Sequence, residues 1–139
     1  MTKRQDSGPL AARDYAVLAR FRLLLRGFVA FSEEAARLAG LTPQQHQALL
    51  AIKGLSSPNG FTIGDLAACL HVRHHSAVGL ADRLVTGGLL RRRPDPADRR
   101  RVQLLLTPRA EHLLAKLSAI HRDELRRLSK ELKPLLAAL

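Results

Sequence analysis

Apolar residues recur at helical spacing over most of this chain, and the interruptions divide it into elements. Residues 10–38 contain no proline and no long polar break, and Gly40 follows as a stop signal, so the pattern predicts one long helix. The segment TPQQHQALLAIKG predicts a second helix. Thr42 is its expected N-cap, Gln45 completes a capping box, and Gly54 marks the end.

Two shorter helices are predicted beyond the loop SSPNG. Thr62 caps the first, and Asp65 places a carboxylate at the positive end of its dipole. The second runs from about His74 to Thr86 and ends at Gly87 and Gly88. Its expected buried face consists of Ala77, Leu80, Ala81 and Leu84. Two short helices with a tight link are typical of a helix-turn-helix.

A hairpin and a last long helix complete the pattern. The segments LLRRR and RVQLLLT flank a turn around residues 94–96, which predicts two antiparallel strands with a loop longer than two residues. Thr107 and Pro108 begin the helix, and Pro134 is expected to disturb its end. The apolar stripe of this helix consists of Leu114, Leu117, Leu125, Leu128 and Leu132.

The element order is long helix, three helices, hairpin, long helix. A chain of 139 residues with 46% apolar residues is sized for a single domain, here 1–139 and mainly α. The terminal helices, 10–39 and 108–139, carry more apolar surface than the small centre can cover. This favours a homodimer formed by those helices. The alternative is that they fold back on their own core.

The charge balance changes the expected partners. There are 23 Lys and Arg against 12 Asp and Glu, so the net charge is 23 − 12 = +11, which favours nucleic acid or an anionic membrane surface as partner. No apolar run approaches the roughly 20 residues of a membrane span. The polar N-terminus lacks the apolar core of a secretion signal, and Cys69 is the one cysteine. We therefore expect a cytoplasmic protein without a membrane partner.

Arginines crowd both flanks of the hairpin turn. They are Arg91, Arg92, Arg93, Arg99, Arg100 and Arg101. Like charges at this density repel one another, and a phosphate backbone would neutralise them. A thin basic hairpin can also place arginine in the minor groove of DNA. The alternative is a solvated basic edge that serves solubility.

Two aspartates stand among these arginines. A carboxylate at Asp98 can hold the Arg100 guanidinium in one geometry through a bidentate pair, which would lower the entropy lost on insertion into a groove. Asp95 lies in the same turn. The alternative for Asp98 is a turn residue that only shapes the hairpin.

The start of the helix at 74–86 carries polar donors at Arg73, His74, His75 and Ser76, which suit base edges or phosphates in the major groove. The histidine pair also suggests a metal site, but adjacent residues on a helix point about 100° apart and no further ligand lies at a suitable spacing. Ser76 beside a histidine suggests a hydrolase, yet no glycine-rich turn presents this serine as a nucleophile. We therefore expect no enzyme, no metal and no cofactor.

Two further residues allow competing interpretations. Cys69 precedes core residue Leu70, so a partly buried structural thiol is expected, with redox sensing as the alternative. His121 lies on the leucine stripe of the last helix. A hydrogen-bonded interface histidine is expected there, with a pH or ligand contact as the alternative.

Three segments, FTIGDLAACLHV, SAVGLADRLVTGGLLRR and DPADRRRVQLLLT, resemble the MarR family of winged helix-turn-helix transcriptional regulators. The resemblance implies a DNA-binding region at 43–106, with the hairpin as the wing, and an intertwined dimer of the terminal helices. It places Arg83 near the DNA backbone and makes Asp98 the residue that orients Arg100. It also implies a small-molecule pocket, although no residue here identifies a ligand or the residues that line it. Three positions depart from the family pattern: Arg73 replaces a Ser or Thr cap, Gly79 lies within a helix, and Ala110 replaces a glycine.

The predicted function is a sequence-specific regulator of transcription that binds double-stranded DNA at a pseudo-palindromic operator, as a repressor relieved by a small molecule. The alternative is a non-specific nucleic-acid or nucleoid-binding structural protein. The expected DNA-binding residues are Arg73, His74, His75, Ser76, Val78, Gly79, Arg83, Arg91, Arg92, Asp98, Arg99 and Arg100.

Overall fold

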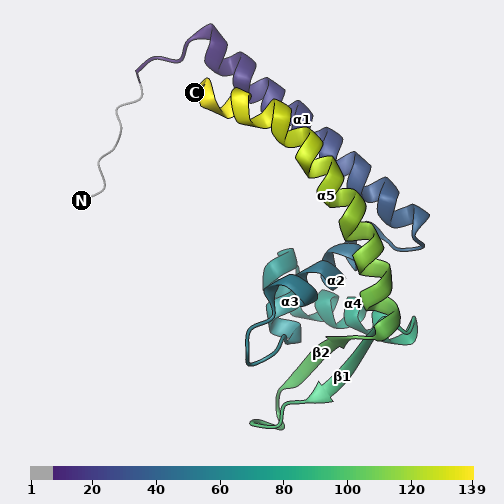
Figure 1. The fold of residues 1–139 in the computed structure, drawn as a ribbon. Coiled ribbons are helices and arrows are strands. Elements are labelled where there is room, and N and C mark those ends of the chain that lie inside the picture. The colour runs from purple at the N-terminus through teal and green to yellow at the C-terminus, as the bar shows by residue number, and fades with distance from the viewer. Residues whose placement is uncertain (1–7) are drawn as a thin grey trace. The chain divides into compact units, whose positions relative to one another are not determined.

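The computed structural model describes residues 8–139. Its elements are α1 (Ala12–Leu38), α2 (Pro43–Leu55), α3 (Ile63–Leu70), α4 (His74–Thr86), β1 (Leu90–Pro94), β2 (Val102–Leu106) and α5 (Pro108–Ala137), as Figure 1 shows. The element order predicted from the apolar pattern is confirmed. Within this described part of the chain, no helix is long and apolar enough to cross a membrane.

The described chain divides into two compact units. One spans Glu33–Ile120 and contains α2, α3, α4 and both strands. The other consists of the described residues up to Ser32 together with His121–Leu139. The long helices α1 and α5 contribute residues to both units.

Capping boxes fix the starts of two helices in the Glu33–Ile120 unit. At α2, Gln45 N–H donates to Thr42 Oγ1 over 3.1 Å, and the Gln45 side chain accepts from the Thr42 N–H over 3.0 Å. At α3, Asp65 does more than complement the dipole, because its Oδ2 accepts from the Thr62 N–H over 2.8 Å. Each box satisfies two backbone donors that a helix start leaves without an intrahelical partner.

The core of this unit gathers apolar residues from α2, α3, α4 and both strands. All four residues predicted for the buried face of α4 are buried. Phe61, Leu66 and Leu104 are also buried, with at most 2% of each exposed. Burial of such side chains contributes about 1.5–3 kcal/mol each, so this core holds α4 in place.

The hairpin is antiparallel, with Leu90 opposite Leu106 and Pro94 opposite Val102. A third extended segment joins it, because Leu104 N–H donates to the Phe61 carbonyl over 2.7 Å and Thr62 forms a bridge with Gln103. The hairpin is thus tied to the chain that precedes α3, and it does not stand as an isolated pair of strands. Two strands alone are marginally stable in water.

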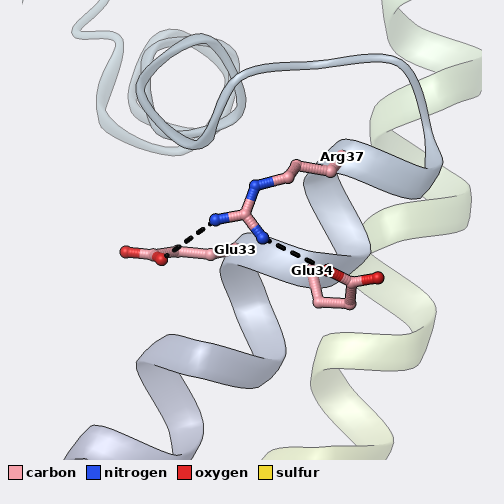
Figure 2. A network of polar contacts seen from close by, with 3 residues as sticks. All are labelled: Glu33, Glu34 and Arg37. Atoms are coloured by element: carbon pink, nitrogen blue, oxygen red, sulfur yellow. Dashed lines mark hydrogen bonds and ion pairs between the residues drawn. The ribbon is translucent and has the colours of Figure 1, made fainter.

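Two ion pairs lie near the C-terminal end of α1. Figure 2 shows Arg37 between Glu33 and Glu34, with Arg37 Nη1 3.2 Å from Glu34 Oε2 and Nη2 3.5 Å from Glu33 Oε2. The arginine also suits the negative end of the helix dipole. All three side chains are substantially exposed, so each pair contributes at most about 1 kcal/mol.

The unit formed by the two chain ends contains segments of α1 and α5. Val17 and Leu128 are buried there, and His121 Nε2 lies 2.8 Å from Ser32 Oγ, with the His121 ring edge-to-face against Phe28 and Phe31. The histidine is hydrogen-bonded, as expected. Whether it also belongs to an interface stays a prediction.

Two features of α5 add detail to the sequence prediction. The helix continues past Pro134 to Ala137, so the proline does not end it. Proline removes one backbone donor, and a helix that is otherwise intact can absorb that loss near its end. Leu125 belongs to the predicted stripe but is 49% exposed in this chain, whereas Leu114 and Leu117 are buried.

Candidate nucleic-acid interface

The start of α4 presents polar side chains to solvent. His74, His75 and Ser76 are exposed, and the N-cap Arg73 makes no side-chain cap hydrogen bond. The departure at Arg73 therefore leaves the first amides of α4 without a side-chain cap. A helix N-terminus of this kind attracts anions through its amides and its dipole.

Further along α4, Val78 and Gly79 are partly buried and Arg83 is exposed. A Cβ built on Gly79 would meet only Arg83 Nη1, at the ordinary contact distance of 3.5 Å. Packing within the chain therefore does not require glycine at this position. Glycine at position 79 is therefore explained either by a molecule that approaches the helix from outside or by the lower helix propensity that glycine confers.

His74 and Arg100, which are far apart in sequence, line one groove of about 320 Å³. Its other walls come from the start of α3 and the base of β2, namely Thr62, Ile63, Gly64, Arg101 and Val102. The fold thus brings together one residue from each of the two predicted contact regions, α4 and the hairpin. Two arginines and a histidine make the groove suited to an anion.

At the hairpin turn, Arg100 is almost fully exposed, with 94% of its side chain accessible. Asp98 Oδ1 accepts from the Arg100 backbone N–H over 3.1 Å and from Arg100 Nε over 3.4 Å. The expected bidentate pair is therefore not formed, because a single oxygen takes both bonds. Asp98 combines the two interpretations, since it shapes the turn and contacts the guanidinium.

Asp95 has a structural place in the turn. Only 7% of it is exposed, and its Oδ1 accepts from the Ala97 N–H over 2.9 Å. The Asp95 N–H donates to the Arg101 carbonyl over 2.9 Å. These bonds close the long loop between the strands, so the aspartate that looked out of place among arginines holds the turn together.

The strand arginines differ from one another in their partners. Arg92 pairs with Asp82 of α4, and Arg93 Nη2 donates to Gln103 Oε1 over 2.8 Å. Arg91 and Arg99 are exposed. Neither partner was predicted from the sequence. The signal for Gln103 was a single polar residue within the apolar run of β2, whereas nothing in the local pattern points from Asp82 to Arg92.

The expectation for Cys69 is wrong, because the thiol is exposed. It lies one helical position, about 100°, away from the partly buried Leu70, and that rotation carries it out of the core. Among residues 8–139, no group of three or more His, Cys, Asp or Glu side chains is arranged to hold a metal ion. Neither observation assigns chemistry to the cysteine.

Comparisons with known proteins agree with this geometry. Residues 39–101 match the model of the MarR family. The transcriptional regulator Tm0710 from Thermotoga maritima is 28% identical with a TM-score of 0.60, and the match covers 82% of this chain and 81% of that one. An S. aureus MepR mutant bound to an oligodeoxyribonucleotide is 20% identical with a TM-score of 0.68, and covers 89% of this chain and 96% of its own. No curated protein sequence matches the chain.

Proposed function

We propose that the chain is a member of the MarR family of winged helix-turn-helix proteins, whose model matches residues 39–101, and that it is a DNA-binding regulator of transcription. In this proposal α4 enters the major groove of double-stranded DNA and the hairpin turn reaches the neighbouring minor groove. The observation that carries it is the groove shared by His74 and Arg100, because one stretch of duplex can contact both.

The residues take different roles in the complex. The start of α4, with Arg73, His74, His75 and Ser76, meets base edges, and Val78 and Gly79 border the same groove. Arg83, Arg91, Arg92 and Arg99 meet phosphates, while Arg100, contacted by Asp98, enters the minor groove. The ion pair with Asp82 neutralises part of the charge of Arg92, so we rank Arg92 below Arg91 as a phosphate contact.

A homodimer is part of the proposal. On α1, Tyr15, Leu18, Leu25 and Val29 are all at least 44% exposed and follow one another at spacings of three, seven and four residues. Such spacing forms one apolar stripe along a helix. The exposed stripe suits a second copy of the chain, and a two-fold dimer would favour a pseudo-palindromic operator.

The finer function, within this proposal, is a repressor that a small molecule releases from DNA. A second candidate is a non-specific nucleic-acid or nucleoid-binding structural protein, which the net charge of +11 also favours. Both candidates lose affinity with salt, at about 0.9 units of log affinity per unit of log salt for each phosphate contacted. Only the regulator prefers particular sequences.

Selection of duplexes from a random pool at moderate salt separates the two candidates. A regulator yields an enriched motif with two related halves, and His75→Ala changes that motif at defined positions. Lys53→Ala is a control that also removes a polar surface side chain, because Lys53 lies on α2, outside the proposed contacts, and pairs with Glu111 of α5. A pool without enrichment would leave the non-specific protein as the function.

A further inference from the structure

We propose that Gln103 is a positioning residue for DNA binding, and that it acts by holding Arg93 as an additional phosphate contact. Neither residue is among the DNA contacts assigned above. The inference deepens the proposed function, because it concerns the same interface. It rests on the contacts of the Gln103 amide, on the glycine that makes room for it, and on the contrast between Arg92 and Arg93.

The amide of Gln103 uses both of its polar atoms. Its Oε1 accepts from Arg93 Nη2 over 2.8 Å, and its Nε2 donates to the Asn59 carbonyl over 3.0 Å. Only 6% of the residue is exposed. Because a buried amide is costly to leave unpaired, these two bonds fix its orientation. The guanidinium of Arg93 is thereby connected to the loop between α2 and α3.

The same loop is built to accept this side chain. A Cβ on Gly60 would lie 2.7 Å from Gln103 Nε2, a distance that real Cβ atoms essentially never show. Gly60 also has a φ of +92°, which glycine adopts more readily than other residues. The backbone bridge between Thr62 and Gln103 continues the contact. A buried glutamine with glycine opposite it indicates a fixed contact between the loop and β2.

Neighbouring strand arginines have partners of different charge. Side chains alternate along β1, so Arg92 and Arg93 point to opposite faces of the hairpin. Arg92 meets the carboxylate of Asp82, which offsets its charge. Arg93 meets a neutral amide oxygen, so it keeps its full charge while its position is restrained. A restrained cation loses less entropy on binding a phosphate.

The charges around Arg93 are mixed. A groove of about 490 Å³ beside it is lined by Arg93, Arg101, Asp95 and Asp98, with Asn59 and Gln103 among its other walls. Both carboxylates already accept hydrogen bonds within the turn. Because two carboxylates offset the two arginines, a small free anion would gain little in this groove. We therefore expect Arg93 to bind a phosphate only as part of a duplex that the rest of the interface holds.

The test uses the salt dependence of binding to one defined duplex, measured for the parent, Arg93→Ala, Gln103→Met and the double variant. Arg93→Ala should weaken binding about tenfold at moderate salt and reduce the slope of log affinity against log salt by about 0.9. Gln103→Met is similar in length but cannot hold the guanidinium. It should weaken binding about three- to fivefold in the parent and have no further effect once Arg93 is replaced.

Arg91→Ala is the matched control, because Arg91 lies on the same face of β1 and faces Leu105 across the ladder. The Gln103→Met effect should persist in full in the Arg91→Ala background. Thermal unfolding checks that each variant folds. A second measurement, the NMR signals of the Arg93 guanidinium without DNA, should show restricted rotation in the parent and averaging in Gln103→Met.

Parent-like binding by Gln103→Met would overturn the inference, as would equal effects of that change with and without Arg93, or averaged Arg93 signals in the parent. Since the slope can be measured on any duplex, these outcomes are separable from failure of the proposed function, which would appear as the absence of an enriched motif.

Discussion

The contact between Asp98 and Arg100 gives the most direct test of the wing. Arg100→Ala should weaken specific binding by at most about 3 kcal/mol, most strongly on sites with A·T-rich flanks, because those have the narrow minor groove that favours arginine. Asp98→Ala should reproduce part of this loss although it removes a negative charge. Simple electrostatics predicts the opposite sign. Equilibrium binding to one operator at two salt concentrations measures both variants.

The control for this prediction is Asp98→Asn, which keeps an oxygen that can accept from the Arg100 backbone N–H. If Asp98→Asn and Asp98→Ala both bind as tightly as the parent or more tightly, the carboxylate does not orient Arg100. The exposed geometry and the 3.4 Å distance from Arg100 Nε to Oδ1 already indicate a weak contact in the unbound chain. We therefore expect the contact between Asp98 and Arg100 to affect binding mainly when DNA excludes water from it.

A second pair, on α5, forms the bidentate contact that Asp98 lacks. Arg127 Nη2 lies 2.6 Å from Glu124 Oε1, and Nε lies 3.1 Å from Oε2. The hydrogen bonds from Arg127 lower the pKa of Glu124. A lowered folded-state pKa stabilises the fold above the pKa of an unfolded glutamate, and this contribution is lost as pH falls through the folded value.

Arg127→Met should therefore raise the pKa of Glu124 towards its ordinary value. The parent should be slightly more stable than the variant near neutral pH, and the difference should disappear in acid. Carboxyl NMR titration and chemical unfolding at the two pH values measure these effects. Arg126→Met is the control, because the Glu124 contacts come from Arg127. An unchanged Glu124 titration would contradict the role of the pair.

Replacement of Gly79 in α4 should affect stability and DNA binding in opposite directions. Alanine there would meet no clash, so Gly79→Ala should stabilise the fold by up to about 1 kcal/mol through helix propensity. If Gly79 borders the DNA, the same change should weaken binding, because the added methyl group separates the helix from the duplex. Thermal unfolding and duplex binding measure the two effects. A variant that is more stable and binds equally well would show that DNA does not approach this position.

Periodicity and end signals were sufficient to predict the helices and the hairpin from the sequence. The bounds of α4 and its four buried residues follow from apolar spacing and from the glycines after Thr86. Cys69 was misjudged, because adjacency in sequence to a core residue says little about exposure on a helix.

The interface was less predictable than the fold, because its contacts join residues that are distant in sequence. The charge and the arginine run were visible in the chain, but the groove between His74 and Arg100 arises only when α4 and the hairpin pack on one core. Likewise, Gln103 meets Asn59 from 44 positions away. A single sequence carries no signal for such pairs. It indicates which residues are available, and the fold decides which of them meet.

For the molecule as a whole, the apolar stripe on α1 makes association of two chains the central expectation. Leu25→Glu places a charge within the stripe and should convert a dimer into a monomer at micromolar concentration, because burial of an unpaired carboxylate costs several kcal/mol. Arg26→Glu is the matched control, since it puts the same charge on an exposed neighbouring position outside the stripe. Sedimentation equilibrium measures the association. A monomeric parent at this concentration would contradict the dimer.

The symmetry of such a dimer also constrains the operator. Two copies of α4 related by a two-fold axis enter successive major grooves on one face of the duplex, about 34 Å or one helical turn apart. The preferred site should therefore contain two inverted half-sites at that spacing.

Inserting five base pairs between the two half-sites, about half a turn, rotates one half-site to the far side of the duplex and should reduce the affinity close to that for unrelated DNA. Inserting ten should restore part of it. The affinity of Leu25→Glu for the native site should not exceed the affinity of the parent for the duplex with five inserted pairs, because a monomer reads a single half-site. Competition binding with these three duplexes measures the effect, and equal affinity for all of them would show that each chain binds DNA independently.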